Sequence, residues 1–437
     1  MSAQLPPESD NVSVKKPGKK RSAALGFIFI TIFIDVLGLG IIVPVLPKLL
    51  ETLGHIDVST ASKYSGWLNF VYASMQLLFA SIIGGLSDKY GRRPVLLISL
   101  FGFSIDYLFM AFAPSIAWLF VGRFIAGVAG ASNATATAYI SDISTGHKRA
   151  ANFGLVGAAS GFGFIIGIGL GAYLGDLNLK FPFLAAAGFA FFNALYGFFV
   201  LPESLKPQHR RNFEWRRANP VGALITIFKR HPELGGLISV LTLVYTAQKS
   251  VEYLLSFYLF EKFEWTLSSV GTLGIFIGVL LVAIQGGLIR YTIPKFGQQK
   301  NIVAGLIFYA VGLILIAFAN QGWMMYLFMI PYCLGGIGGP ALQAFATEKV
   351  AKNEQGELQG AITIVNSLSV IIGPLLFGYT FYASTNKNGS WYFPGFSYLI
   401  GALMVVIAMF IVIRSFRKSD AAKHKREPSP AHLPLQK

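Results

Sequence analysis

Apolar residues are grouped along this chain into long runs that polar segments separate. Each run holds roughly 20 residues or more, a length that lets an α-helix cross the ~30 Å hydrocarbon core of a bilayer. The pattern predicts twelve spans, over approximate residues 23–50, 63–86, 94–113, 116–138, 152–175, 181–201, 234–260, 267–289, 300–318, 323–346, 358–383 and 392–414. We therefore expect an all-α membrane protein with twelve transmembrane helices.

One internal polar segment is much longer than the others and divides the predicted spans six and six. It covers residues 202–233 and is basic, with His209, Arg210 and Arg211 in a row. The sequence therefore predicts two six-helix bundles, a linker between them and a polar tail at each end. The expected boundaries are tail 1–22, bundle 23–201, linker 202–233, bundle 234–414 and tail 415–437.

Composition and charge support a membrane protein. Hydrophobic residues make up 54% and charged residues 13%, whereas a soluble domain carries about 25% charged residues. The net charge of +16 could suggest a nucleic-acid partner, but the basic residues avoid the apolar runs and gather in alternate loops, as cytoplasmic Lys and Arg do. We therefore expect a lipid bilayer and no nucleic acid, with both termini, and the linker, in the cytoplasm. With this orientation, the only Lys or Arg residues in the outer segments are Lys48, Lys63, Lys180, Lys262 and Lys387.

No motif in the chain indicates catalysis or a cofactor. There is no Gly-Lys-Ser/Thr phosphate-binding loop, so ATP is not the expected energy source. The six His lie in predicted loops and tails, and Cys333 is the single cysteine. We expect no catalytic residues, no metal and no cofactor.

The segment between the second and third spans combines glycines with charges. It begins at Gly84 and continues with Asp88, Gly91, Arg92 and Arg93. Gly91 permits the tight reversal of the chain, while Asp88 can accept hydrogen bonds from a helix N-terminus or an arginine, and the two arginines can pair with acids or phosphates. These five residues are our candidates for gating.

The two halves look like weak copies of each other. Gly-Gly-Leu at 84–86 recurs at 286–288, and the glycine-rich fifth span around Gly167 matches Gly373 in the eleventh at nearly the same shift. Two parallel six-helix repeats are the layout of the major facilitator superfamily, and the loop that starts at Gly84 resembles its signature loop. The resemblance implies two bundles related by pseudo-two-fold symmetry, transport by alternating access, and a loop that acts as a cytoplasmic latch in the outward-facing state.

Further segments narrow the resemblance. Residues 35–47, 102–108, 122–127, 340–343, 355–360 and 372–376 are similar to the tetracycline/proton antiporters of the 12-span drug:proton antiporter family. This resemblance runs from about residue 25 to 412. It implies a role in proton-coupled export for Asp35, Asp106 and Arg123, and a location in the bacterial inner membrane.

The chain also departs from that family. Tetracycline exporters carry a histidine in span 8 and an aspartate in span 9, where this chain has Leu281 and Tyr309 by alignment. The proline of the antiporter motif in span 5 is missing from residues 163–172. The departures weigh against tetracycline itself as the substrate.

Charges within spans are costly, at about 2.5–3.5 kcal/mol each, so they are usually paired or functional. Asp35 would take and release a proton, or would be a packing acid bonded to a neighbouring helix. Asp106 and Arg123 lie on consecutive spans and could pair, in which case Asp106 stays charged and is structural. In the alternative, Asp106 handles protons or substrate, and the charge of Arg123 shifts the proton affinity of a nearby acid.

Span 7 carries polar residues at spacings of three or four, so they share one helical face that must look into the bundle or a wet cavity. Lys249 and Glu252 could form a structural pair, or a pair that opens when a substrate carboxylate binds Lys249 or a proton neutralises Glu252. The residues of this face are Tyr245, Gln248, Lys249, Glu252 and Ser256.

Span 2 presents a second polar face, and two lone amides lie at midplane depth in spans 8 and 11. Such groups often hold helices together, at about 0.6 kcal/mol each, but they are also candidate substrate contacts. They are Asn69, Tyr72, Gln76, Gln285 and Asn366.

The leading hypothesis is a monomeric secondary transporter that exports an amphipathic small molecule in exchange for protons. One alternative is uptake or exchange of a polar anionic metabolite, such as a carboxylate-rich siderophore, with Lys249 as the anchor. A second alternative is a receptor or sensor that has lost transport.

Overall fold

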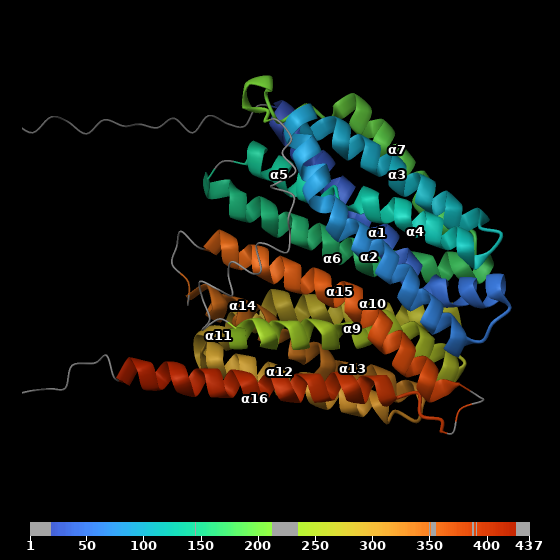
Figure 1. Ribbon diagram of the computed structural model, residues 1–437, viewed down its shortest axis with the longest axis vertical. Coiled ribbons are helices and arrows are strands. Elements are labelled where there is room, and N and C mark those ends of the chain that lie inside the picture. The colour runs from blue at the N-terminus through green and yellow to red at the C-terminus, as the bar shows by residue number, and fades with distance from the viewer. Residues whose placement is uncertain are drawn as a thin grey trace, which may run out of the picture.

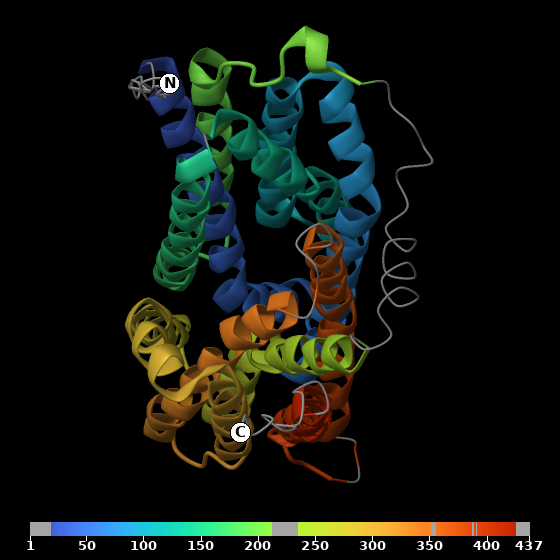
Figure 2. The ribbon, with the colours of Figure 1, turned by 90° about the vertical axis from the view of Figure 1, so that its left-hand side faces the viewer.

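The structure is a computed structural model that describes residues 19–144, 146–211, 235–348, 350, 355–386, 389 and 391–424. Most of the predicted tails and of the linker lies outside the described residues. Within the described ranges the chain forms helices, turns and bends, and no strand. The first half, in blue to green, lies on one side of the molecule and the second half, in yellow to red, on the other (Figures 1 and 2).

The helices follow the predicted spans, with ends that differ by several residues. The first half contains α1 (Lys19–Gly54), α2 (Val58–Tyr90), α3 (Arg92–Phe112), α4 (Ile116–Gly130), α5 (Asn133–Ile143), α6 (Gly146–Leu177) and α7 (Phe181–Val200). After the short 3₁₀ turn η1 (Pro207–His209), the second half contains α9 (Gly235–Phe263), α10 (Leu267–Ala283), the π-helical turn η4 (Ile284–Leu288), α11 (Ile289–Phe296), α12 (Gln298–Ala317), α13 (Gly322–Leu334), the 3₁₀ turn η5 (Gly335–Ile337), α14 (Gly338–Glu348), α15 (Gln355–Thr385) and α16 (Phe396–His424).

Within the described residues, eleven helices or helix runs are long and apolar enough to cross a membrane. The predicted seventh span, α9, is 29 residues long but is not among them. Gln248, Lys249 and Glu252 lie in its middle and lower its mean hydropathy. The prediction of an all-helical membrane protein is confirmed, whereas the count of twelve spans stays a prediction.

Three predicted spans are broken rather than continuous. The span over 116–138 divides into α4 and α5, the span over 267–289 contains η4, and the span over 323–346 contains η5. At the last break Gly335 lets the ring of Tyr309 pack against the backbone, because a Cβ there would lie 1.9 Å from Cδ2 of Tyr309. Hydrophobic runs do not reveal such breaks, because an interrupted helix can be as apolar as a continuous one.

Close backbone contact joins α1 to α6 in the first half. A Cβ on Gly163 would lie 2.5 Å from the carbonyl oxygen of Phe33, and one on Gly167 would lie 2.3 Å from that of Leu37. Gly171 repeats the contact one turn further on, 2.6 Å from the carbonyl oxygen of Ile41. Small residues at a spacing of four let helices in a membrane approach this closely.

The two halves touch at one end of the molecule, which we call the closed end. There α2 meets α15, where the hydroxyls of Ser59 and Thr385 lie 2.8 Å apart. On the other side α6 meets α10, where Asp176 accepts hydrogen bonds from the backbone N–H of Ser268, at 3.1 Å, and from its hydroxyl.

The same helix pairs separate toward the opposite end, which we call the open end and where residues 201–211 lie. A Cβ on Gly84 of α2 or on Gly360 of α15 would meet open space, and so would one on Gly157 of α6 or Gly286 of η4. The structure is therefore closed between the halves at one end and open at the other.

The glycine contact between α1 and α6 predicts an asymmetric effect of alanine within one helix. We expect Gly167→Ala to cost about 1–3 kcal/mol, because the added methyl meets backbone atoms. Gly161→Ala is the control, since a Cβ there would meet open space; it should be neutral or slightly stabilising. Thermal unfolding of the detergent-purified variants measures both, and equal melting temperatures would contradict close α1–α6 packing.

Candidate functional site

A cavity of about 590 Å³ lies mostly in the second half. Its walls come from α9, α10, η4, α12 and the α13–α14 region, and Val43, Phe164 and Ile168 of the first half close one side. Most of its wall is apolar, as in sites for small organic ligands. The side chains that can make hydrogen bonds are Tyr245, Gln248, Glu252, Ser256, Gln285, Tyr309, Tyr332 and Gln343.

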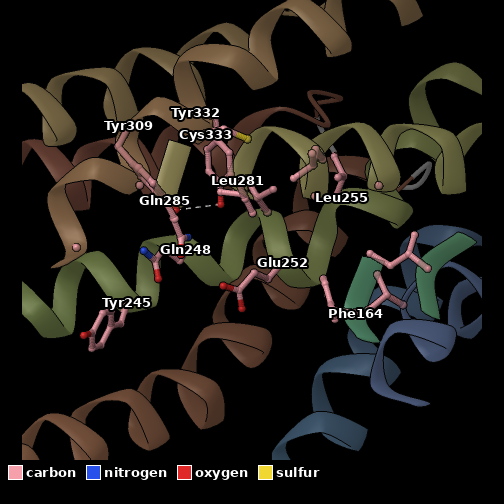
Figure 3. Close-up of a pocket in the computed structure, with 18 of the residues that line it drawn as sticks. Phe164, Tyr245, Gln248, Glu252, Leu255, Leu281, Gln285, Tyr309, Tyr332 and Cys333 are labelled. Atoms are coloured by element: carbon pink, nitrogen blue, oxygen red, sulfur yellow. Dashed lines mark hydrogen bonds between the residues drawn. The ribbon is translucent and has the colours of Figure 1, made fainter. Parts of the chain in front are cut away.

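Helix α9 supplies the polar side of this cavity. Tyr245, Gln248, Glu252 and Ser256 all belong to the lining, and their spacing of three or four residues places them on one face of the helix. Figure 3 shows Gln248 and Glu252 extending from α9, with Phe164 approaching from the first half. Of the face that the sequence predicts, only Lys249 is absent from the lining.

Lys249 and Glu252 form an ion pair between Nζ and Oε2. The two partners differ in exposure, since the side chain of Lys249 is 14% exposed and that of Glu252 is 49% exposed. The stem of Lys249 packs beside Gly373 of α15, where a Cβ on the glycine would lie 2.6 Å from the Cβ of Lys249. The pair therefore presents its carboxylate to the cavity, while the stem of Lys249 lies against a neighbouring helix.

Two tyrosines form another part of the wall. The hydroxyl of Tyr309 donates to that of Tyr332 at 3.1 Å, and the ring centroids are 4.7 Å apart (Figure 3). Tyr309 and Leu281 both line the cavity. Sequence reasoning missed Tyr332 and Gln343, because a single Tyr or Gln in an apolar run gives no sign of which way it points.

The first half contains a separate polar cluster formed by α2, α3 and α4. Arg123 and Asp106 form an ion pair between Nη2 and Oδ2, with side chains 8% and 1% exposed. The guanidinium of Arg123 also lies over the ring of Tyr72, 5.7 Å from its centroid. Gln76 donates to the Tyr72 hydroxyl at 3.4 Å and to the carbonyl oxygen of Gly130 at 3.2 Å.

Asp35 lies on α1, which approaches α3 close by, since a Cβ on Gly38 would lie 1.9 Å from the hydroxyl oxygen of Tyr107. Its Oδ1 atom is buried and has no hydrogen-bond partner among the described residues. A buried carboxylate oxygen without a partner is costly as long as the group is charged. Oδ1 of Asp106 is also buried without a described partner, but its Oδ2 pairs with Arg123, whereas Asp35 has no described counter-charge.

Two predicted contacts lie outside the cavity. Asn69 donates to the carbonyl oxygen of Ser65 at 3.1 Å within its own helix, and Asn366 is exposed on α15. Neither residue belongs to the lining, whereas Gln285 does.

The predicted gating residues form a network at the open end. Arg92 pairs with Asp88 at 2.6 Å and lies 3.5 Å from Asp142 of α5. Glu203 accepts hydrogen bonds from the backbone N–H groups of Arg92, at 2.9 Å, and Arg93, at 3.2 Å, at the start of α3.

Gly91 makes this arrangement possible. It has a φ of 109°, and a Cβ there would lie 2.3 Å from Oε2 of Glu203. Every described partner of Asp88 and Arg92 lies between residues 84 and 211. The network therefore connects segments of the first half with one another. It makes no described hydrogen bond or ion pair with the second half. The sequence did not point to Glu203 or Asp142, which are far from the loop along the chain.

Comparison with known proteins identifies the family. The family model of the Major Facilitator Superfamily matches residues 28–374 and 286–437. The tetracycline resistance protein, class C, of Escherichia coli is 37% identical over 401 residues, which cover 89% of this chain and 96% of that protein. The tetracycline resistance protein, class G, of Vibrio anguillarum is 36% identical over 403 residues, which cover 91% and 99%.

The chain therefore belongs to the major facilitator superfamily, and it is a multi-pass membrane transporter rather than an enzyme. The fold agrees, since the solved structure of the nucleoside transporter NupG superposes with a TM-score of 0.72 at 15% identity, covering 90% of this chain and 99% of that one. The predicted fold class and the resemblance to tetracycline resistance transporters are confirmed.

The buried pair of Asp106 and Arg123 leads to a stability prediction. Asp106→Asn leaves the guanidinium of Arg123 buried without a counter-charge, so we expect a loss of about 3–5 kcal/mol. Glu51→Gln is the control, because it removes an acid from a partly exposed pair with Lys48 that is worth about 0–1 kcal/mol. Thermal unfolding in detergent compares the two. Wild-type stability of Asp106→Asn would show that the pair is not structural and would favour the alternative, in which Asp106 handles protons or substrate.

Proposed function

We propose that this transporter exports an amphipathic small molecule in exchange for protons. Asp35 carries the proposal, because its buried Oδ1 has no described hydrogen-bond partner. Such a carboxylate is stabilised by protonation, since the neutral form costs less away from water. Asp35 can therefore bind a proton in one state of the transporter and release it in another, when water or a partner reaches it.

The substrate side of the proposal rests on the second half. The cavity combines an apolar wall with a few hydrogen-bonding groups, which suits a molecule with one large apolar part and several polar groups. Relatives named for tetracycline resistance, and the multidrug resistance protein 2 of Bacillus subtilis at 27% identity, point in the same direction. The resemblance sets Leu281 and Tyr309 against the histidine and the aspartate of tetracycline exporters, so we expect a substrate other than tetracycline itself.

Alternating access gives the two ends of the molecule their roles. We place both termini and the open end in the cytoplasm of a bacterium, with the closed end on the outer side of its inner membrane. The structure then represents the inward-facing state, in which an exporter takes up its substrate from the cytoplasm. In this state the loop at Asp88 makes no described contact with the second half, and we infer that its latch function belongs to the outward-facing state.

The outer gate in this proposal depends on a carboxylate that bridges the halves. Asp176 of α6 accepts a hydrogen bond from the N–H of Ser268, in the first turn of α10. A negative charge there is stabilised by the helix dipole and by the unpaired N–H groups of the first turn. Asp176 therefore favours the closed outer end.

The first prediction concerns coupling. Asp35→Asn should abolish transport driven by a pH gradient, because an amide cannot carry a proton, while exchange of labelled for unlabelled substrate without a gradient should continue. Proteoliposomes with an imposed pH gradient, loaded with ethidium or tetracycline as trial substrates, measure both activities. Asp35→Glu is the control, since it keeps the titrating group and should keep some gradient-driven transport. Wild-type rates in Asp35→Asn would remove Asp35 from the mechanism.

The second prediction concerns the gate. Asp176→Asn removes a charge worth about 1 kcal/mol at the N-terminus of α10, so the population with an open outer end should rise a few-fold. Spin labels at the exposed positions 177 and 323, in a background with Cys333→Ser, report the distance between the halves. Asp57→Asn is the control, because Asp57 caps α2 within its own half and Asn caps helices equally well. An unchanged distance distribution in Asp176→Asn would show that this contact does not hold the gate.

A further inference from the structure

We propose that the cavity in the second half selects cationic solutes, and that the carboxylate of Glu252 pairs with their positive centre. The inference rests on the proposed function, because it takes this cavity as the substrate site. It assigns the charge of the substrate, which the apolar wall alone does not decide.

The charge of the lining is the first argument. Glu252 is the only Asp, Glu, Lys or Arg among the residues that form the described cavity. Its side chain is 49% exposed, while its partner Lys249 is 14% exposed and does not belong to the lining. A solute that enters the cavity therefore meets a negative group before it meets a positive one.

The geometry of the ion pair leaves room for a second cation. Lys249 contacts Oε2 of Glu252, and Oε1 has no hydrogen-bond partner in the described part of the chain. A carboxylate can accept several hydrogen bonds on its two oxygens. A solute cation can therefore approach Oε1 while Lys249 stays in place, so that the pair need not break before the solute binds.

The rest of the wall suits a lipophilic cation. Tyr245, Tyr309, Tyr332 and Phe164 bring aromatic rings to the lining, and the faces of such rings attract cations. The hydroxyls of Tyr309 and Tyr332 are bonded to each other, which satisfies polar groups that would otherwise need water. Aromatic surface next to one carboxylate is a site for a molecule with a large apolar body and a single positive charge.

An anionic substrate fits the same geometry poorly. Lys249 does not belong to the lining, so its ammonium group would have to give up Glu252 and turn into the cavity to reach an anion. Glu252 would then remain in the cavity without its partner and would repel the anion. In the cationic case Lys249 stays on Oε2 and only partly offsets the charge of Glu252.

A pair of probes with matched shape and opposite charge tests this assignment. Tetraphenylphosphonium and tetraphenylborate share a four-phenyl body, and triphenylphosphine oxide is a neutral probe of similar kind. Equilibrium binding to the detergent-purified full-length protein is measured without a pH gradient. We expect the wild-type protein to bind the phosphonium cation more tightly than the borate anion.

Variants of the pair sharpen the test. Glu252→Gln should raise the dissociation constant of tetraphenylphosphonium at least tenfold, or about 1.4 kcal/mol, and should change that of the neutral probe less than twofold. Lys249→Met should lower the dissociation constant of the cation, because it removes a positive charge that repels the cation and partly neutralises Glu252. Glu261→Gln is the matched control, since Glu261 lies on the same helix but outside the lining, and it should bind all probes as the wild type does.

Other results would overturn the inference. If Glu252→Gln binds the cation within twofold of the wild type, the site takes neutral solutes. If the wild type binds the borate more tightly than the phosphonium, and Lys249→Met abolishes borate binding, the site takes anionic solutes. If Glu252→Gln also loses binding of the neutral probe, Glu252→Asp is the second variant to measure. Retained phosphonium binding in Glu252→Asp supports the role of the charge, whereas a loss as large as in Glu252→Gln contradicts it.

The experiment separates this inference from the proposed function. If phosphonium binds through Glu252 but no probe is transported on a pH gradient, the cation site stands and proton-coupled export falls. If a neutral or anionic probe is transported on the gradient while phosphonium does not bind, export stands and the cation site falls.

Discussion

A charged side chain inside a bilayer must be paired, must face water, or must give up its charge, because the hydrocarbon core offers it no hydrogen-bond partner. The described spans of this protein show three such cases. Arg123 and Asp106 neutralise each other in the first half. Glu252 faces the cavity with Lys249 behind it, and Asp35 keeps a buried oxygen without a partner. The polar architecture of the transporter follows from where these charges lie.

The positions of these charged groups also suggest different roles for the two halves. The cluster around Asp35 and Tyr72 lies in the first half, while the cavity lies mostly in the second. In our proposal the first half handles the proton and the second half handles the solute. Their coupling then requires relative motion of the halves, which meet at the closed end through α2 with α15 and α6 with α10.

Glycine-rich contacts and polar contacts have different roles in that motion. Gly163, Gly167 and Gly171 let α1 and α6 touch through their backbones within one half, and such dense packing resists rearrangement. Between the halves, by contrast, Asp176 with Ser268 is an exposed polar contact, whereas Ser59 with Thr385 is buried. The exposed contact of Asp176 can exchange with water at little cost, which is what a gate requires.

The sequence by itself determined the helical membrane fold, because the lengths of apolar runs report directly on the thickness of the bilayer. It also identified the polar face of α9, since the 3.6-residue period places Gln248 and Glu252 together whatever surrounds them. It could not tell which member of a polar pair looks into the cavity, nor that Asn366 lies outside the cavity. The sequence also did not predict the roles of Glu203 and Tyr332 or the helix breaks at η4 and η5. These features depend on how each helix is rotated and on which distant segment packs against it, and only the tertiary structure decides that.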